Sequence, residues 1–383
     1  MNASRPTIAD VAREAQVSPS TASLVYSGKG RVADATRDRV LAAAAALGYA
    51  GPDPRAASLR LGRSGIVGVV VQQPLGDVFL DPVNRLMMDG LADALAPLGA
   101  GILLLRDSPA EAASVDTDTP EHPGPATLTL TTAPVDAVVL LGCSGRLDRP
   151  LEVLRSRGVP AVVIEGDAGD DVPRILLHDV DAQRYLAEHV RELGHERVAI
   201  VALWFGETGT TGFADAADVP SIAVTRRRLE GARAVYPDAP VWQTRASSID
   251  EGIEAGRALL TDASGAALPA GERPTAVLAQ SDLLAVGVIR AAEEAGLRVP
   301  DDLSVTGFDG IEVDGFSPRL LTTITQPAAG KGRLAGESVV RLLDGETLAE
   351  TVTLGCVYRA GDTVAGPAGD RDTAAVLPSP PRP

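Results

Sequence analysis

Polar side chains follow two apolar segments in the second half of the chain. Ser281 and Asp282 come directly after TAVLAQ, and Asp309 comes directly after LSVTGF. In parallel α/β sheets, ligands bind beyond the carboxyl ends of the strands. Hydroxyl and carboxylate oxygens at such positions accept hydrogen bonds from sugar hydroxyls or from the N–H group of a base. The pattern therefore predicts a small-molecule site, next to which we expect Asp282 to act as the N-cap of the following helix.

A second group of polar residues lies near the N-terminus, in the stretch VSPSTASLVYSGKGRV at 17–32. Ser18 can supply the oxygen that caps a helix, and Pro19 fits the first helical position, where its missing N–H costs nothing. The further hydroxyl groups of Ser20, Thr21 and Ser23 can contact DNA phosphates or base edges. The alternative is an ordinary cap on a solvent-exposed helix.

Hydrophobic spacing predicts three short helices around this stretch. Apolar residues recur at i, i+3, i+4 and i+7 from Ile8, which predicts a helix over 7–15. A second helix over 19–26 follows after a tight turn, and a third over 34–47 follows a glycine-containing loop. The arrangement has the spacing of a helix-turn-helix.

The charge of the chain is unevenly distributed. The formal net charge is −16, yet residues 1–64 carry +4 and the remainder carries −20. A small basic segment on an acidic body fits a DNA-binding module attached to a part that should not bind DNA. The alternative is chance clustering of solvated charges.

From residue 65 onward, apolar segments that resemble strands alternate with amphipathic stretches. Segments such as IVGVVV at 66–71 and GILLL at 101–105 are apolar throughout, which is typical of parallel strands covered on both faces. The length of this region predicts two such α/β lobes.

Several other classes of protein and site are disfavoured. We find no apolar run typical of a signal peptide or a membrane span, so we expect a cytoplasmic protein. Cys143 and Cys356 are far apart in sequence and have no ligand-like spacing, so neither a disulfide framework nor a zinc site is indicated. No cofactor and no metal are expected.

The head sequence TIADVAREAQVSPSTASLVYSGKGRVADATRDRVLAAAAALGY closely resembles that of the lactose and purine repressor (LacI) family. The resemblance continues through PDPRAASLRLGRSG and over most of 65–362, most clearly in PTAVLAQSDLLAVGVIRAAEEAGLRVPDDLSVTGFDG. It implies a periplasmic-binding-protein-like pair of α/β lobes with an effector in the cleft between them. The expected parts are a helix-turn-helix head at 1–50, a hinge at 51–64, a body at 65–365 and a disordered tail at 366–383.

The resemblance also implies which residues contact DNA. Leu59 matches the leucine that the family inserts into the minor groove at the operator centre, and Arg55 and Ala56 belong to the DNA-contacting segment that flanks it on the N-terminal side. The positions that match base-reading residues are Pro19, Ser20 and Leu24, and those that mostly hold the backbone are Thr7, Ser18, Thr21, Ser23, Ser27, Arg31 and Thr36. Leu24 departs from the family, which commonly has a polar reader there. A leucine cannot hydrogen-bond a guanine, so the alternatives are packing on a thymine methyl group or weak base readout. The hinge also has one residue more than the purine-repressor pattern.

In the body, the resemblance implies effector contacts at Arg228, Ser281 and Asp309. Arg228 lies in TRRRLEG, so the alternative is an arginine on the surface. Phe79 and Trp204 can stack on a ligand ring or lie in the core. Ser281 stands where the family often has asparagine, and HDVD at 178–181 replaces its usual Asp-Asn.

These features predict a transcriptional regulator that is not an enzyme. We expect a homodimer, which can pair further to a tetramer, bound to a palindromic operator and switched by a small molecule, for which we expect a sugar. Repression is the expected direction. A solute-binding protein of transport is the alternative that the body alone allows. A nucleotide-dependent enzyme is disfavoured, because QQPLG rather than a glycine fingerprint follows VGVVV.

Overall fold

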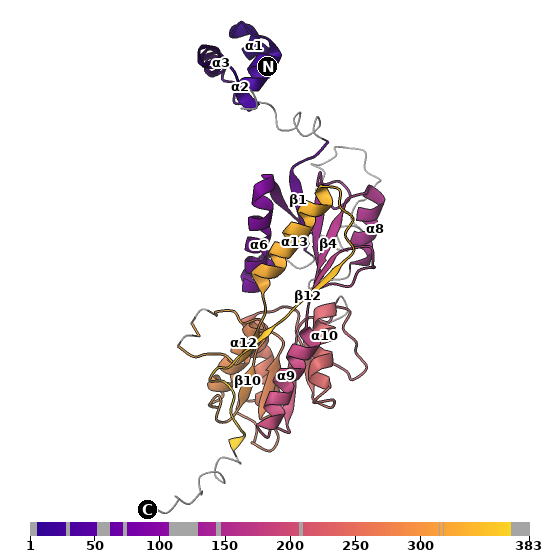
Figure 1. Ribbon diagram of the computed structural model, residues 1–383. Coiled ribbons are helices and arrows are strands. Elements are labelled where there is room, and N and C mark those ends of the chain that lie inside the picture. The colour runs from indigo at the N-terminus through magenta and orange to yellow at the C-terminus, as the bar shows by residue number, and fades with distance from the viewer. Residues whose placement is uncertain are drawn as a thin grey trace, which may run out of the picture. The chain divides into compact units, whose positions relative to one another are not determined.

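Figure 1 shows the protein as a computed structural model. The structure describes residues 6–27, 31–51, 62–71, 75–106, 129–142, 147–206, 210–313, 315–316 and 318–368. The chain divides into two compact units, Met1–Gly65 and Ile66–Pro383.

The described part of the first unit consists of three helices: α1 (Ile8–Glu14), α2 (Pro19–Ser27) and α3 (Asp34–Leu47). Thr7 and Asp10 form a capping box at the start of α1, because each side chain accepts a hydrogen bond from the other residue's backbone N–H. The three helices enclose a core of small apolar residues: Val11, Ala12, Ala15, Ala22, Val40, Ala43, Ala44 and Tyr49. The three predicted helices are therefore present, each within a residue or two of its expected bounds.

The turn between α1 and α2 contains a residue with left-handed backbone. Gln16 has a φ of 53°, and the Val17 N–H donates to the carbonyl of Ala12 over 2.9 Å. This geometry ends α1 as a glycine commonly would and lets α2 begin three residues later.

The first lobe of the second unit is built on a six-stranded parallel sheet with the order β12-β5-β4-β3-β1-β2. Its strands are β1 (Ile66–Val71), β2 (Gly101–Arg106), β3 (Ala137–Leu141), β4 (Ala161–Ile164), β5 (Arg174–Leu177) and β12 (Thr351–Leu354). Its helical elements are α5 (Leu75–Leu80), α6 (Pro82–Leu95), η1 (Ala96–Leu98), α8 (Asp148–Arg157) and α13 (Ala328–Leu343).

Helices cover both faces of this sheet. Residues of α6 and α13 pack with Val67, Val69 and Val71, whereas residues of α8 pack with Val70 and Val138. Successive side chains of a strand point to opposite faces, so the near-continuous apolar strands are explained by burial on both sides. Figure 1 shows α6 in purple beside α13 in orange, although these helices are far apart in sequence.

The second lobe has a five-stranded sheet with the order β10-β9-β6-β8-β7. It is parallel except for the short pair β7 and β8. Its strands are β6 (Val198–Ala202), β7 (Gly212–Phe213), β8 (Val241–Gln243), β9 (Ala276–Ala279) and β10 (Ser304–Thr306). Its helices are α9 (Asp179–Glu192), α10 (Ala223–Arg233), α11 (Ile249–Leu260) and α12 (Asp282–Glu294). Helices α11 and α12 pack against one face of the sheet, and α9 and α10 pack against the other.

The chain passes between the two lobes at three short connections. They lie at His178 between β5 and α9, at 326–327 before α13, and at 355–356 after β12. The pair β11 (Thr323–Thr325) and β13 (Val357–Arg359) is antiparallel and lies next to two of these connections. Because only these short segments join the lobes covalently, a change in their backbone angles changes the angle between the lobes. In the ranges given above, no helix has the length and apolar character needed to cross a membrane.

Candidate functional site

One face of α2 presents the residues expected to read DNA. Ser20, Ser23 and Leu24 have the spacing i, i+3 and i+4, and all three side chains are exposed. Ala22 lies on the opposite face and is fully buried against the other helices. The exposed face thus offers two hydroxyl groups and one apolar side chain, and none of the residues of α2 carries a charge.

The N-terminus of α2 uses part of the hydroxyl cluster internally. Ser18 Oγ accepts a hydrogen bond from the Thr21 N–H over 3.1 Å, so Ser18 is the predicted cap. Ser18 Oγ also lies 2.8 Å from Thr21 Oγ1 and 2.9 Å from Ser20 Oγ. The hydroxyl groups of Ser20 and Thr21 are not needed as the cap, and they lie close to Ser18 at the N-terminus of α2. The partial positive charge of this helix end favours the binding of a phosphate.

The other positions expected to contact DNA divide into three groups. Thr7 is exposed but serves as the cap of α1. Pro19 and Arg31 are exposed, and Thr36 is half-buried in the first turn of α3. The hinge residues Arg55, Ala56 and Leu59, together with the side chain of Ser27, lie outside the described residues.

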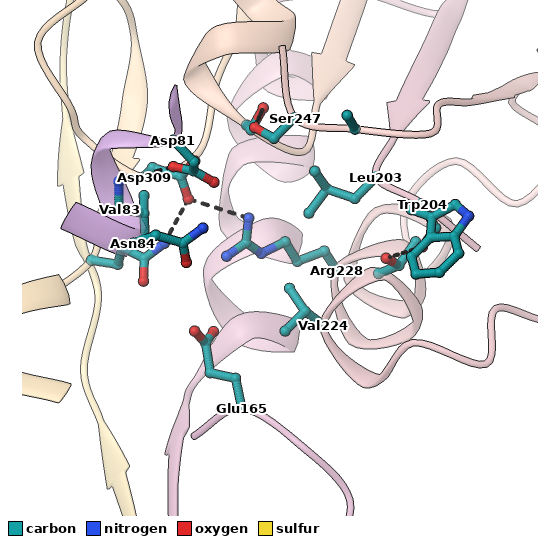
Figure 2. A pocket seen from close by; sticks show the side chains of 14 residues that line it. Asp81, Val83, Asn84, Glu165, Leu203, Trp204, Val224, Arg228, Ser247 and Asp309 are labelled. Atoms are coloured by element: carbon teal, nitrogen blue, oxygen red, sulfur yellow. Dashed lines mark hydrogen bonds and ion pairs between the residues drawn. The ribbon is translucent and has the colours of Figure 1, made fainter. Parts of the chain in front are cut away.

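A pocket lies between the two lobes of the body, with charged side chains in its walls (Figure 2). The first lobe contributes Asp81, Val83, Asn84 and Glu165, and Gln326 lies at the connection before α13. The second lobe contributes Leu203, Trp204, Val224, Thr225, Arg228, Ala246, Ser247, Ser281 and Asp309.

Arg228 points from α10 toward Asp309 (Figure 2). Its Nη1 atom donates to the Gln280 carbonyl over 2.6 Å and lies 3.4 Å from Asp309 Oδ1, and its Nε atom lies 3.3 Å from Asp179 Oδ1. The guanidinium also stacks over the ring of Phe308, with 3.7 Å between Cζ and the ring centroid. Since Arg228 is 2% exposed, the surface alternative for this residue is wrong.

The two arginines before Arg228 also form ion pairs, and Arg227 shares Asp179 with Arg228. Arg227 Nε donates to Asp179 Oδ2 over 3.2 Å, and Arg226 Nη2 donates to Asp167 Oδ2 over 2.6 Å. Asp167 belongs to the first lobe, in the loop after β4, so this pair joins the two lobes. Each of the three consecutive arginines thus has a different role.

The charges around Arg228 perturb one another. Burial opposes the charged form of Arg228, but Asp309, Asp179 and Glu165 outweigh it and raise its pKa above the ordinary value. Burial raises the pKa of Asp309 well above its usual range, and it also raises the pKa values of Asp179 and Asp81. Residues in a cleft whose pKa values are perturbed by burial and by specific charge partners are candidates for a functional site.

Asp309 is held in an unusual backbone conformation. Its φ is +124°, and its N–H donates to the Ile324 carbonyl over 2.7 Å. Its Oδ1 atom accepts a second side-chain hydrogen bond, from Gln326 Nε2 over 2.6 Å. A non-glycine residue at this angle stores strain that the surrounding structure must offset, which fixes the carboxylate in the pocket wall.

Glu165 and Lys331 form a buried ion pair in the first lobe. Burial opposes ionisation of Glu165, but Lys331 and Arg228 outweigh it and hold the pKa of Glu165 below its usual range. Glu165 has a left-handed backbone with a φ of 53°. Its Oε1 atom is buried and has no hydrogen-bond partner among the described residues.

The structure corrects the expected N-cap of α12. Ser281, rather than Asp282, is the N-cap, because Ser281 Oγ accepts a hydrogen bond from the Leu284 N–H over 3.2 Å. Ser281 Oγ also accepts a hydrogen bond from Ser247 Oγ over 2.9 Å and lines the pocket. Asp282 instead accepts hydrogen bonds from the Ile311 N–H and from Thr323 Oγ1, and burial raises its pKa to about 6.

The two aromatic residues have different environments. Trp204 is half-buried and is among the residues that line the pocket (Figure 2). Phe79 lies on the short helix α5, is 62% exposed and is not among the residues that line the pocket. It is therefore neither a core residue nor part of this wall.

Sequence reasoning missed several polar residues of the pocket wall. Glu165 follows the apolar strand β4, so the strand-end rule that found Asp309 could also have found it. Asp81 caps α6 by accepting a hydrogen bond from the Val83 N–H over 2.9 Å, and a capping pattern alone does not reveal its place in a pocket. Nothing in the local sequence marks Asn84, Ser247 or Gln326. Across the described ranges, no three His, Cys, Asp or Glu side chains are grouped as metal ligands are.

Comparisons with known proteins agree with this architecture. Residues 7–51 match the family described as bacterial regulatory proteins, lacI family, and 187–364 match the periplasmic binding protein-like domain. An HTH-type transcriptional regulator of Mycolicibacterium smegmatis is 34% identical over 345 residues, which cover 87% of this chain and 89% of that protein.

Two solved structures share the fold. The transcriptional regulator CelR in complex with cellobiose is 25% identical, with a TM-score of 0.61 and coverage of 94% of this chain and 100% of that chain. The lac repressor dimer bound to operator and the anti-inducer ONPF is 23% identical, with a TM-score of 0.69 and the same coverage.

A helix-turn-helix unit on the same chain as a two-lobed, periplasmic-binding-protein-like unit defines a DNA-binding transcriptional regulator. The chain belongs to the LacI family of bacterial regulatory proteins. This confirms the family and the mixed α/β fold predicted from the sequence.

Proposed function

We propose that this regulator binds a roughly palindromic operator as a homodimer, represses transcription, and is switched by a sugar held between the lobes of its body. The observation that carries the proposal is the buried Arg228–Asp309 pair in the wall of a pocket, on a chain whose other unit is a helix-turn-helix. The structures of similar fold include a repressor dimer on its operator and a regulator with bound cellobiose. We expect this protein to act in the cytoplasm, where chromosomal DNA is.

The proposed switch follows from the origin of the pocket walls. Asp81, Asn84 and Glu165 belong to the first lobe, and Arg228 and Asp309 belong to the second. A ligand that touches both walls binds one angle between the lobes better than another. It therefore shifts the equilibrium between these angles by its difference in binding free energy, commonly about 1–3 kcal/mol.

The proposed DNA contacts come from α2 and the hinge. Ser20, Ser23 and Leu24 form the exposed face that we assign to the major groove. Leu59 is assigned to the minor groove at the operator centre, as the family resemblance implies. In a homodimer, two such heads read two half-sites, which accounts for the expected palindrome.

The alternative of a solute-binding protein of transport is less well supported. The M. smegmatis relative is named as an HTH-type transcriptional regulator, and it aligns with 87% of this chain. A solute-binding protein would not need the helix-turn-helix at 7–51. An enzyme is not favoured either, because the relative's name implies regulation rather than catalysis.

Fluorescence anisotropy tests the proposal directly. The full chain is titrated with a labelled duplex from its own promoter region and with a scrambled duplex of equal length, at low and moderate salt. We expect the promoter duplex to bind at least 100-fold more tightly, because specific complexes exceed non-specific ones by about 10³ or more. Equal weak binding to both duplexes that moderate salt removes would show charge attraction alone and contradict the proposal.

A further inference from the structure

Two buried oxygen atoms in the pocket wall lack a hydrogen-bond partner among the described residues. They are Glu165 Oε1 and Gln326 Oε1, and the two residues are 3% and 6% exposed. Both residues line the pocket between the lobes. Leaving a buried acceptor unsatisfied costs about 1–3 kcal/mol, and more when the group is charged. A molecule that enters the pocket with hydrogen-bond donors would remove this cost.

The cations near the pocket already have partners. Lys331 is fully buried and paired with Glu165, and Arg227 is paired with Asp179. Arg228 is the only cation among the described residues that line the pocket, and it faces both Asp179 and Asp309. The lining carboxylates Asp81, Glu165 and Asp309 outnumber it three to one.

A phosphate group would therefore meet an unfavourable field. A phosphate monoester carries about −1.5 to −2 charges at neutral pH, and a buried charge without a counter-charge is costly. Burial opposes the charged forms of Asp309 and Asp81 and raises their pKa values, whereas Lys331 and Arg228 hold the pKa of Glu165 below its usual range. Hydroxyl groups, in contrast, donate to carboxylate and amide oxygens without adding charge.

We infer that the effector is an uncharged sugar, that phosphorylated sugars are excluded, and that the Glu165–Lys331 pair sets this discrimination. Lys331 acts as a positioning residue: its Nζ atom holds Glu165 Oε2, and Oε1 remains available to the ligand. The inference rests on the proposed function, since it concerns the same pocket. It specifies the charge class of the ligand, which the family assignment leaves open.

Isothermal titration calorimetry of the full chain tests the inference with matched sugars. Ribose is compared with ribose 5-phosphate, glucose with glucose 6-phosphate and glucosamine, and cellobiose is added as a neutral disaccharide. We expect at least one neutral sugar to bind. If that sugar is ribose or glucose, we expect it to bind at least tenfold more tightly than its phosphorylated or amino counterpart. Tighter or equal binding of a phosphorylated sugar or of glucosamine overturns the inference, and so does the failure of every neutral sugar to bind.

A double variant tests the role of the ion pair. Glu165→Gln with Lys331→Met removes both buried charges together, so neither is left unpaired. We expect neutral-sugar affinity to fall about tenfold and the preference over the phosphorylated counterpart to narrow by a similar factor. Arg155→Gln with Asp171→Asn removes an exposed pair in the same lobe and is the matched control. An unchanged preference in the Glu165/Lys331 variant overturns the assigned role.

The outcomes separate this inference from the proposed function. Anisotropy without any sugar reads operator binding alone. If specific DNA binding is present and a phosphorylated sugar is the tighter ligand, only the inference fails. If specific DNA binding is absent, the proposed function fails whatever the calorimetry shows.

Discussion

Arg226 Nη2 on α10 lies 2.6 Å from Asp167 Oδ2 and so joins the second lobe to the first. Arg227 Nη1 is 3.9 Å from the other oxygen of Asp167, and its Nε atom is paired with Asp179. Three covalent connections also join the lobes, and a change in their backbone angles changes the angle between the lobes. The ion pair therefore favours the lobe angle described here over angles at which its two side chains are apart.

A double-mutant cycle with Arg226→Gln and Asp167→Asn measures this contact. Both side chains are substantially exposed, and exposed pairs contribute about 0.2–1 kcal/mol, so we expect a coupling free energy in this range. Urea unfolding of the four proteins gives the value. The coupling should decrease in 1 M NaCl, because salt screens exposed charges. A coupling of zero at low salt would show that the pair does not hold the lobes.

Loss of Arg228 should be far more costly than loss of Arg226. Arg228→Met leaves Asp179 and Asp309 buried without their main counter-charge, which should lower the free energy of unfolding by about 3–5 kcal/mol. Arg226→Met, two residues earlier on the same helix, should lower it by less than about 1 kcal/mol. Denaturant unfolding compares the two variants. Similar losses of unfolding free energy in the two variants would contradict the conclusion that Arg228 neutralises the buried carboxylates of Asp179 and Asp309.

Asp282 should make the stability of the protein depend on pH. Its pKa is raised to about 6 by burial, against an unperturbed value of 3.8, so the folded protein binds the proton more tightly than the unfolded chain. The contribution of Asp282 to stability is therefore greatest below about pH 4 and is lost as the pH rises through about 6. The loss is on the order of 3 kcal/mol, from about 1.4 kcal/mol per pKa unit.

Asp282→Asn isolates this effect. Asparagine keeps an oxygen for the Ile311 N–H and cannot ionise. We expect the variant to be more stable than the parent at pH 7.5 and to approach it at pH 4, as measured by urea unfolding across this range. A difference that does not change with pH would show that Asp282 titrates at an ordinary pKa in the folded protein.

Much of the architecture could be predicted because it depends on local order along the chain. The Ser18–Pro19 start of α2 and the strand ends before Ser281 and Asp309 are read from neighbouring residues. Which of Arg226, Arg227 and Arg228 turns inward depends on the rotation of α10 against α9, which no short window of sequence contains. The wrong N-cap has a similar cause, because Asp282 is drawn to Ile311 and Thr323, which are distant in sequence.

The sequence around Lys331 indicates a buried ion pair. It shares the buried side of α13 with Ala335 and Val339, at intervals of four residues, and all three are fully buried. A lysine on such an apolar stripe requires a buried counter-charge. The partner, Glu165, is 166 residues away in sequence, so the need for a partner could be predicted but not its identity.

The packing of α13 on α6, which holds Lys331 in place, requires glycine at position 332 but not at position 330. A Cβ atom added at Gly332 would collide with the carbonyl oxygen of Met87, whereas one added at Gly330 would meet only Pro327 Cβ, at 3.4 Å. Gly332→Ala must therefore push the helices apart, and we expect it to lower the free energy of unfolding by about 1–3 kcal/mol. Gly330→Ala should leave stability unchanged or raise it by up to about 1 kcal/mol, because alanine is the better helix former. Urea unfolding of the two variants measures both changes in the free energy of unfolding. Equal changes would contradict the close approach of the two helix backbones at Gly332. If the spacing of these helices also positions Lys331, then Gly332→Ala, unlike Gly330→Ala, should weaken the binding of neutral sugars.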